Sequence, residues 1–248
     1  MSGVKKVLVV GSSGFVGNYM MYTLATRYPN VQVVGMSRTA LPRDDATAKL
    51  PNVSYIKGDA LNPDSFSKQI EDVDGVIHCV GTLIEKKNNP KLTYDAMNRD
   101  TAMNVAAELQ EYAEKTGHNR NFVLISSEKA PPFLDRYLTS KLEAEEFILK
   151  ECTNLNSVML RPGFIYNKQY RWWSIPLKGF VDLAWWMNEK VAKQMPFGSY
   201  FDFLFPAKSV RLSTLAKFAV DGVMGDLKDQ KIIRNETLVK YDNEHPNE

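Results

Sequence analysis

The chain has 248 residues, of which 44% are hydrophobic and 24% are charged, and its formal net charge at pH 7 is +2. A composition this close to the globular average excludes wholesale disorder, and so small a charge gives no argument for a nucleic-acid partner. No run reaches the ~18 apolar residues that a membrane span needs, and no signal peptide or cleavable Arg-rich transit peptide is visible.

Short apolar runs alternate with helical patterns along the first two thirds of the chain. The runs are rich in β-branched residues and end at turn residues, which is typical of strands buried on both faces. Six strands are predicted, at residues 6–11, 31–37, 53–59, 75–81, 121–127 and 157–166. A long helix is expected over about 93–116, and another begins with "RYLTSK" at Arg136. This alternation predicts an α/β fold, a doubly wound parallel sheet of the Rossmann type.

The pattern changes after about residue 167. The segment 168–209 is rich in aromatic residues, Pro and Lys, and the sequence from Val210 onward again has a helical pattern. The polar tail "DNEHPNE" is expected to fray. We therefore expect one Rossmann domain over residues 1–248, in which about 168–209 forms a small irregular lobe over the ligand edge.

The stretch "GSSGFVG" follows the first predicted strand and opens a helical pattern, which is the position of a dinucleotide-binding loop. In such a loop Gly11 would allow a tight turn, Gly14 would let the backbone approach a pyrophosphate, and Gly17 would let the helix pack on the strand. The spacing is GxxGxxG rather than GxGxxG. In the alternative interpretation the glycines serve only the turn between strand and helix. The predicted cofactor contacts of this loop are Gly11, Ser13, Gly14, Phe15, Val16 and Gly17.

The end of the second predicted strand bears on which nucleotide fits. Ser37 and Arg38 stand where an acidic residue would accept the ribose hydroxyls of NAD, and no carboxylate follows before Asp44. Because a guanidinium favours a 2′-phosphate, the sequence predicts NADP(H), with NAD(H) as the alternative if Arg38 is only a surface residue. Asp59 would accept a hydrogen bond from the adenine amino group or cap the next helix. The further predicted cofactor contacts are Ser37, Arg38, Asp59, Ala60, Cys79, Val80 and Gly81.

These residues, together with "YLTSK" at 137–141 and "LRPGFIY" at 160–166, resemble the short-chain dehydrogenase/reductase superfamily over roughly residues 5–225. The GxxGxxG spacing is similar to that of its extended and atypical branches. Within them, the chain resembles two mitochondrial groups: a reductase-like protein associated with coenzyme Q (ubiquinone) biosynthesis, and the nucleotide-binding accessory subunit of respiratory complex I. The first resemblance is the closer one. It implies a mitochondrial location, whereas the sequence alone indicates an intracellular protein whose import would need an internal or uncleaved signal.

The same resemblance implies a catalytic group. In the superfamily's enzymes a tyrosine and a lysine in YxxxK act with a serine from the preceding strand, which here would be Tyr137, Lys141 and Ser127, with Ser126 as the alternative serine. Because an unperturbed tyrosine titrates near ~10, Tyr137 would need a nearby cation, and Lys141 lies one helical turn away. Lys141 would also hold the nicotinamide ribose. The resemblance adds the cofactor contacts Pro162, Gly163 and Phe164.

Two other interpretations of the YxxxK pair stay open. The pair could be one turn of a solvated helix face, or Lys141 could clamp a nucleotide that is bound without turnover. Only nine residues separate Ser127 from Tyr137, fewer than extended enzymes of the superfamily usually have, and a double proline stiffens that segment. We therefore expect nucleotide binding more firmly than catalysis.

The aromatic segment 168–209 also has three interpretations. Its tryptophans and phenylalanines would pack as a lid over the cofactor, form an apolar pocket for a prenylated or quinone-like ligand, or dock on a membrane surface or a membrane-associated protein complex. The three histidines, His78, His118 and His245, do not cluster in sequence, so no metal site is predicted. The two cysteines, Cys79 and Cys152, are expected to be reduced and structural.

Overall fold

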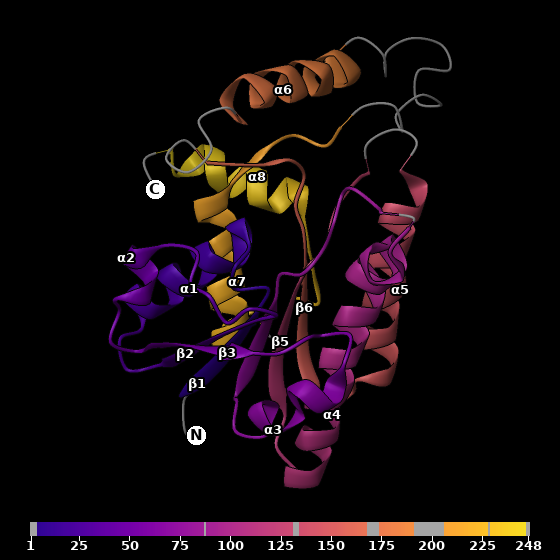
Figure 1. Ribbon diagram of the computed structural model, residues 1–248. Coiled ribbons are helices and arrows are strands. Elements are labelled where there is room, and N and C mark those ends of the chain that lie inside the picture. Colours follow the sequence, from indigo (N-terminus) through magenta and orange to yellow (C-terminus); the bar gives the residue numbers. More distant parts are fainter. Residues whose placement is uncertain are drawn as a thin grey trace.

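The computed structural model describes residues 4–86, 88–130, 134–167, 174–190, 206–227 and 229–246 (Figure 1). Seven parallel strands form one sheet in the order β3-β2-β1-β4-β5-β6-β9. The strands are β1 (Lys6–Val10), β2 (Gln32–Ser37), β3 (Val53–Lys57), β4 (Gly75–His78), β5 (Arg120–Ile125), β6 (Leu155–Arg161) and β9 (Ile232–Arg234). The predicted doubly wound α/β fold is confirmed. The short edge strand β9 was not predicted from the sequence.

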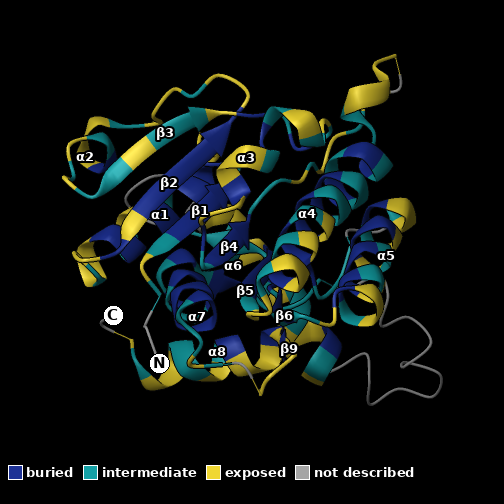
Figure 2. Cartoon of the chain, turned by 90° about the horizontal axis from the view of Figure 1, so that it is seen from below, coloured by how far each residue is buried: buried dark blue, intermediate teal, exposed yellow. Residues whose placement is uncertain are grey.

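Helices cover both faces of the sheet. One face is covered by α1 (Phe15–Arg27) and α7 (Leu212–Met224), and the other by α3 (Ser67–Ile70), α4 (Thr101–Thr116) and α5 (Asp135–Glu151). The remaining described helical segments are α2 (Asp45–Ala48), η1 (Pro63–Ser65), η2 (Pro90–Leu92), the π-helix η3 (Asp95–Asp100), α6 (Ser174–Lys190) and α8 (Asn235–Glu244). Figure 2 shows the central strands buried between these layers, with exposed residues on the outer sides of the helices.

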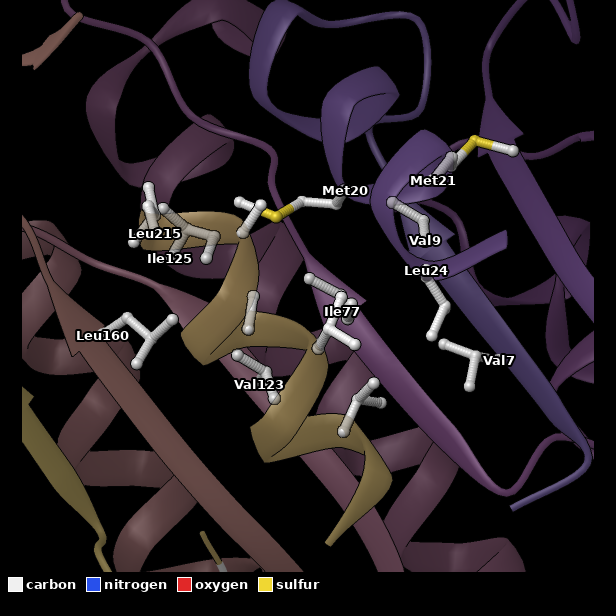
Figure 3. Packing of buried hydrophobic residues seen from close by; sticks show 14 of the residues in the cluster. Val7, Val9, Met20, Met21, Leu24, Ile77, Val123, Ile125, Leu160 and Leu215 are labelled. Carbon is white, nitrogen blue, oxygen red and sulfur yellow. The ribbon is translucent and has the colours of Figure 1, made fainter. Parts of the chain in front are cut away.

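The alternation of side chains along the strands builds two separate cores. Val7 and Val9 of β1 point to the α1/α7 face and join Met20, Leu24 and Leu215 in one core (Figure 3). Leu8 and Val10, the intervening residues, belong to the other core, beneath α3, α4 and α5. Because successive side chains of a strand point to opposite faces, a run such as "VLVV" supplies both cores at once. This is why these strands are continuous apolar runs.

The predicted strand 157–166 is two elements in the structure. β6 ends at Arg161, and after Pro162 and Gly163 the chain forms β7 (Ile165–Tyr166), which pairs in parallel with β8 (Val210–Arg211). This small second sheet directs the chain away from the main sheet and towards α6.

The helix α6 lies beyond the carboxyl ends of the strands, beside β7 and outside the two helical layers (Figure 1). It belongs to the predicted lobe 168–209, so the expectation of an irregular lobe is wrong for residues 174–190. Other lobe aromatics, such as Trp172, Trp173 and Phe197, lie outside the described residues. In the part of the chain that the structure describes, no helix is long and apolar enough to cross a membrane.

The expected fraying of the tail is wrong for its first residues. Asp242 lies in α8 and accepts a 2.8 Å hydrogen bond from the main-chain nitrogen of Arg211. The guanidinium of Arg211 pairs with the same carboxylate at 3.2 Å, and Thr214 donates to it as well. A polar tail can therefore be ordered here, because its carboxylate caps the strand and helix that precede it.

Candidate functional site

The glycine loop lies between β1 and α1 at the carboxyl edge of the sheet. Gly11 has φ +85°, which L side chains rarely adopt, and its amide donates a 2.9 Å hydrogen bond to the main-chain oxygen of Met36. A β-carbon on Gly17 would approach the Gly11 carbonyl oxygen to less than 3.0 Å, and one on Gly14 would lie 3.0 Å from that oxygen. The turn and the close helix packing thus both need glycine. This geometry is compatible with the interpretation that the glycines serve only the turn.

The loop lines a pocket, which favours the interpretation that the glycines serve a bound ligand. Ten of the predicted cofactor contacts line it: Gly11, Ser13, Gly14, Ser37, Arg38, Asp59, Ala60, Cys79, Val80 and Gly81. The helix α1 points its N-terminus at this place, with Gly14 as its N-cap and no acidic residue in its first turn. The N-terminus of a helix attracts anions, so the pocket fits a phosphate group. Phe15, Val16 and Gly17 are not among the lining residues, because they belong to the helix behind the loop.

The sequence analysis missed part of the pocket lining. Met36, Gly58, Leu61, Lys91, Met97 and Thr101 also line it. Lys91 and Thr101 come from segments that only the fold brings to this edge, so no local pattern could identify them. Asp59 uses one carboxylate oxygen to accept from the Leu61 amide at 3.1 Å, and Lys91 lies 3.8 Å from the other oxygen. Asp59 therefore caps a turn and lines the pocket, whereas the cap of the next helical segment, η1, is Asn62 and not Asp59 as predicted.

A second arginine lies at the glycine loop. Arg43, from the segment after β2, donates a 3.2 Å hydrogen bond to the main-chain oxygen of Ser13. The neighbouring Asp44 does not point its charge at the pocket: its carboxylate accepts from the Thr47 amide at 2.9 Å and from Asn18 Nδ2 at 2.6 Å. Burial opposes ionisation of Asp44, but these hydrogen bonds outweigh it and lower the pKa of the carboxyl group. Arg38 thus lines the pocket and Arg43 lies at the glycine loop, while the carboxylate of Asp44 is engaged by Thr47 and Asn18.

The helix α5 brings the predicted catalytic residues together. Tyr137 and Lys141 are 9% and 5% exposed, so the interpretation of a solvated helix face is wrong. Ser127 lies near Tyr137, and the interaction of the two side chains lowers the pKa of the tyrosine. The Ser127 hydroxyl also donates to the Lys129 carbonyl at 2.9 Å. The nine-residue separation is therefore long enough to bring Ser127 close to Tyr137.

The expected effect of Lys141 on Tyr137 is wrong in this structure. Burial raises the pKa of Tyr137 and outweighs the interaction with Ser127, and Tyr94, packed edge-on at 6.0 Å between ring centroids, raises it further. The Lys141 ammonium donates to the main-chain oxygen of Ile125 at 3.0 Å and lies 5.9 Å from the centroid of the Tyr137 ring. Burial of Lys141 in turn lowers its pKa to about 8. Lys141 is thus directed at the end of β5 rather than at the tyrosine hydroxyl.

Lys141 nevertheless reaches the pocket. A β-carbon on Gly81 would lie 3.2 Å from Lys141 Nζ, and Gly81 lines the pocket. The same added β-carbon would lie 3.1 Å from Asn98 Oδ1. Asn98 is 1% exposed and accepts a 2.7 Å hydrogen bond from the amide of Thr82. Asn98 therefore fixes the backbone after β4 beside the lysine.

Sequence reasoning did not identify Asn98. It lies in the π-helix η3, at the start of what was predicted as one uniform helix over 93–116. The wider turn of a π-helix often occurs at functional sites, and a buried asparagine inside a helix needs partners that lie outside it. Here the partners are Thr82 and, at 3.4 Å, the hydroxyl of Ser140. A helical asparagine in the sequence carries no signal of such partners.

The structure separates the two candidate serines. Ser126 is 4% exposed and hydrogen-bonds the buried carboxylate of Glu145, which also pairs with Arg161 at 2.5 Å. The hydroxyl of Ser126 is therefore engaged by the Glu145 carboxylate. Of the two serines, Ser127 is the one that influences the pKa of Tyr137, which favours it over the alternative serine.

The "PGF" residues Pro162, Gly163 and Phe164 do not line the pocket. The Gly163 amide donates to Asn235 Oδ1 at 2.7 Å, and a β-carbon on Gly163 would approach the Lys208 carbonyl oxygen to less than 3.0 Å. Gly163 thus has a packing role where β6 leaves the sheet. Contact of Pro162, Gly163 and Phe164 with a cofactor stays a prediction.

Both cysteines are free thiols, and burial raises the pKa of Cys79 to about 12. Across the described residues no group of three His, Cys, Asp or Glu side chains is arranged to hold a metal ion.

Comparisons with known proteins agree with a nucleotide-binding pocket. Residues 11–175, more than half of the chain, match a family model described as NAD(P)H-binding. The "MIOREX complex component 2" of Saccharomyces cerevisiae is 23% identical over 205 residues, which cover 66% of this chain and 74% of the yeast protein. The "3 beta-hydroxysteroid dehydrogenase/Delta 5-->4-isomerase" of Mycobacterium tuberculosis is 26% identical over 183 residues, 65% of this chain but only 47% of that protein.

Among solved structures, a short-chain type dehydrogenase/reductase from Mycobacterium ulcerans has the same fold. It superposes with a TM-score of 0.69 and 15% identity, covering 96% of this chain and 92% of the other. At that identity the likeness concerns the fold alone.

Proposed function

Because this chain belongs to the NAD(P)H-binding family, we propose that it is an NAD(P)H-dependent oxidoreductase of the short-chain dehydrogenase/reductase type. The observation that carries the proposal is the convergence of three buried side chains, with Lys141 at Gly81 on the pocket edge and Ser127 interacting with Tyr137. The substrate class is a carbonyl or hydroxyl compound, or a quinone.

Each side chain then has one task. A bound nicotinamide supplies or accepts the hydride. Ser127 donates a hydrogen bond to the substrate oxygen, and Tyr137 gives that oxygen its proton during reduction or takes it during oxidation. Lys141, whose ammonium lies beside Gly81, holds the ribose. Asn98 acts through the backbone after Gly81 and is a positioning residue.

We further propose that the preferred nucleotide is NADP(H). Arg38 lines the pocket and Arg43 donates to Ser13 in the glycine loop, so two guanidinium groups are available to a 2′-phosphate. The carboxylate of Asp44, which follows them, is engaged by Thr47 and Asn18. It is therefore not free to accept the ribose hydroxyls of NAD.

The proposed setting is the mitochondrion, in support of ubiquinone biosynthesis. This part of the proposal is supported by the resemblance of "GSSGFVGNYM", "RYLTSKLEAEEFI" and "LRPGFIY" to the reductase-like group. The yeast relative is named as a component of a complex, which supports the further proposal that this protein works within an assembly.

A second function is favoured by two observations. The pKa of Tyr137 is raised rather than lowered, and the Lys141 ammonium is bound to the Ile125 carbonyl. Both features suit a subunit that retains its nucleotide for structural reasons, such as an accessory subunit of respiratory complex I. In that case the nucleotide would stabilise the fold without turnover.

The substitution Tyr137→Phe separates the two functions. In cells that contain only this variant, the oxidoreductase proposal expects a fall in ubiquinone content with normal assembly of complex I, because the proton donor is lost while the nucleotide still binds. Tyr22→Phe, an exposed tyrosine of α1, is the matched control and should change nothing. A Tyr137→Phe protein that supports full ubiquinone content would overturn the catalytic role.

The nucleotide itself is identified by denaturing gently purified protein and analysing the released compound by mass spectrometry. We expect NADP(H). A protein that releases no nucleotide and binds neither NADPH nor NADH on titration would contradict both functions. Gly14→Asp, which places a carboxylate at the proposed pyrophosphate position, should abolish binding in either case.

A further inference from the structure

The helix α6 exposes five large apolar side chains, while Val181 of the same helix is buried. Phe180 is 69% exposed and Leu183 is 56% exposed, and Leu177, Trp186 and Met187 are exposed as well. Two polar side chains of the same helix face inward: Asn188 is 1% exposed, and Asp182 accepts from the main-chain nitrogen and the hydroxyl of Ser209 at 3.0 and 2.6 Å. An ordinary surface helix buries its apolar stripe, whereas most of the large apolar side chains of α6 are exposed.

The exposed residues form one continuous face. Among the described side chains of α6, the exposed ones are at positions 176, 177, 179, 180, 183, 186, 187 and 190. These positions recur every three or four residues, so they lie on one side of the helix. In this set only Lys190, the last residue, is charged. The face is thus apolar over its whole length, with a cation at its end.

The orientation of α6 is held by contacts of its inner side. Lys178 pairs with Asp182 at 2.5 Å, and its ammonium lies 5.0 Å from the centroid of the Tyr166 ring in β7. Lys208 lies 5.0 Å from the centroid of the Trp185 ring. Because these contacts tie the polar side of the helix to β7 and to residues 208–209, they keep the apolar side outward.

The charge of the surrounding sequence indicates what covers this face. Residues 168–208 contain six Lys or Arg and three Asp or Glu, an excess larger than the net charge of +2 of the whole chain. Exposed Trp, Phe and Leu on one side of a helix, with basic residues at its flanks, are typical of helices that lie in the interface of an anionic membrane. Contiguous apolar patches on soluble surfaces mark such interaction sites.

We propose that α6 is a membrane-docking helix whose apolar face enters the surface layer of an anionic lipid bilayer. Since α6 lies beyond the carboxyl ends of the strands (Figure 1), docking brings that edge of the sheet to the membrane. The helix then lies in the plane of the membrane surface. The inference is independent of the nucleotide chemistry, since it involves no residue of the pocket.

Vesicle flotation tests the proposal with the full-length protein. We expect the wild type to float with phosphatidylcholine vesicles that contain one quarter cardiolipin. The double variant Phe180→Ser/Met187→Ser should remain with the unbound protein, with affinity reduced at least roughly tenfold. The matched control is Leu41→Ser/Ile84→Ser, which removes two exposed apolar side chains elsewhere (63% and 77% exposed) and should float like the wild type. Unchanged thermal unfolding of both variants shows that they are folded.

Three results would overturn the proposal. The wild type could fail to bind cardiolipin vesicles, or the α6 variant could bind them as well as the wild type does. Sedimentation could also show a wild-type dimer that the α6 variant dissociates, with no vesicle binding. That last result would assign the face to a second copy of the chain.

Discussion

Lys141 Nζ donates a 3.0 Å hydrogen bond to the main-chain oxygen of Ile125, and a β-carbon on Gly81 would lie 3.2 Å from the same nitrogen. A buried cation therefore connects the end of β5 with the pocket above the glycine loop. Burial lowers the pKa of this lysine from 10.5 to about 8. A buried charge opposes folding, and side chains with strongly shifted pKa values are concentrated at functional sites.

The first prediction concerns this charge and pH. Below about pH 8 Lys141 is protonated in both the folded and the unfolded chain, so its burial destabilises the fold fully. Between about pH 8 and 10.5 only the unfolded chain keeps the proton, so the destabilisation fades as the pH rises. Relative to Lys141→Met, the wild type should gain about 2 kcal/mol of unfolding free energy from pH 7 to pH 10. Urea unfolding of both proteins at the two pH values measures this, and an unchanged difference would contradict the lowered pKa.

The second prediction concerns acid. His78 is fully buried at the end of β4, and burial, together with the charge of Lys141, lowers the pKa of its imidazole to about 3. From pH 6.5 downwards the unfolded chain binds a proton that the folded chain does not, so stability is lost as the pH falls. His78 should account for about 3 kcal/mol of the loss by pH 4. Urea unfolding at pH 7 and pH 4 measures the unfolding free energy that each protein loses in acid. His78→Asn should lose less than the wild type by that amount, and equal losses would exclude this role of His78.

The third prediction concerns the glycine loop. Gly17→Ala should destabilise the protein by about 2 kcal/mol or more and abolish NADPH binding, because its methyl group would collide with the Gly11 carbonyl. Gly179→Ala is the control: no atom lies within 4 Å of an added β-carbon in α6. Alanine there should be neutral or stabilise by up to about 1 kcal/mol. Thermal unfolding and NADPH titration check both, and a fully stable, nucleotide-binding Gly17→Ala protein would refute the packing argument.

The fourth prediction concerns the choice of nucleotide. Arg43→Ala and Arg38→Ala should each weaken NADPH binding by about tenfold, equivalent to about 1.4 kcal/mol, with little effect on NADH. The reason is that only NADPH carries the 2′-phosphate for their charge-assisted hydrogen bonds. Lys49→Ala removes an exposed positive charge from the same region and is the control for long-range electrostatics. Equal losses for NADPH and NADH would show that the arginines do not distinguish the two.

Much of this protein could be predicted because the signals are local. The apolar runs "KVLVV" and "NFVLI" place β1 and β5 within a residue or two, since a strand buried on both faces needs such a run. Gly11 and Gly17 could be identified because the strand–turn–helix context fixes their neighbours. The YxxxK pair needs only one helical turn to bring Tyr137 and Lys141 to the same helix face.

Other features depended on contacts between distant segments. Arg43 reaches Ser13 across 30 positions, and Asn98 reaches Thr82 across 16, so neither role appears in a sequence window. The raised pKa of Tyr137 follows from burial, which no motif reports. The strand β9 is three residues long and exists because it pairs with β6.

The sequence by itself determined the fold class and the place of the glycine loop, because side-chain periodicity and backbone freedom act over a few residues. Only the tertiary structure decided that Ser127, and not Ser126, meets Tyr137, that Lys141 points to Ile125, and that α6 carries its apolar face outward. These depend on burial and on partners far away in the chain, and a helical pattern has the same period whichever side it turns to the core.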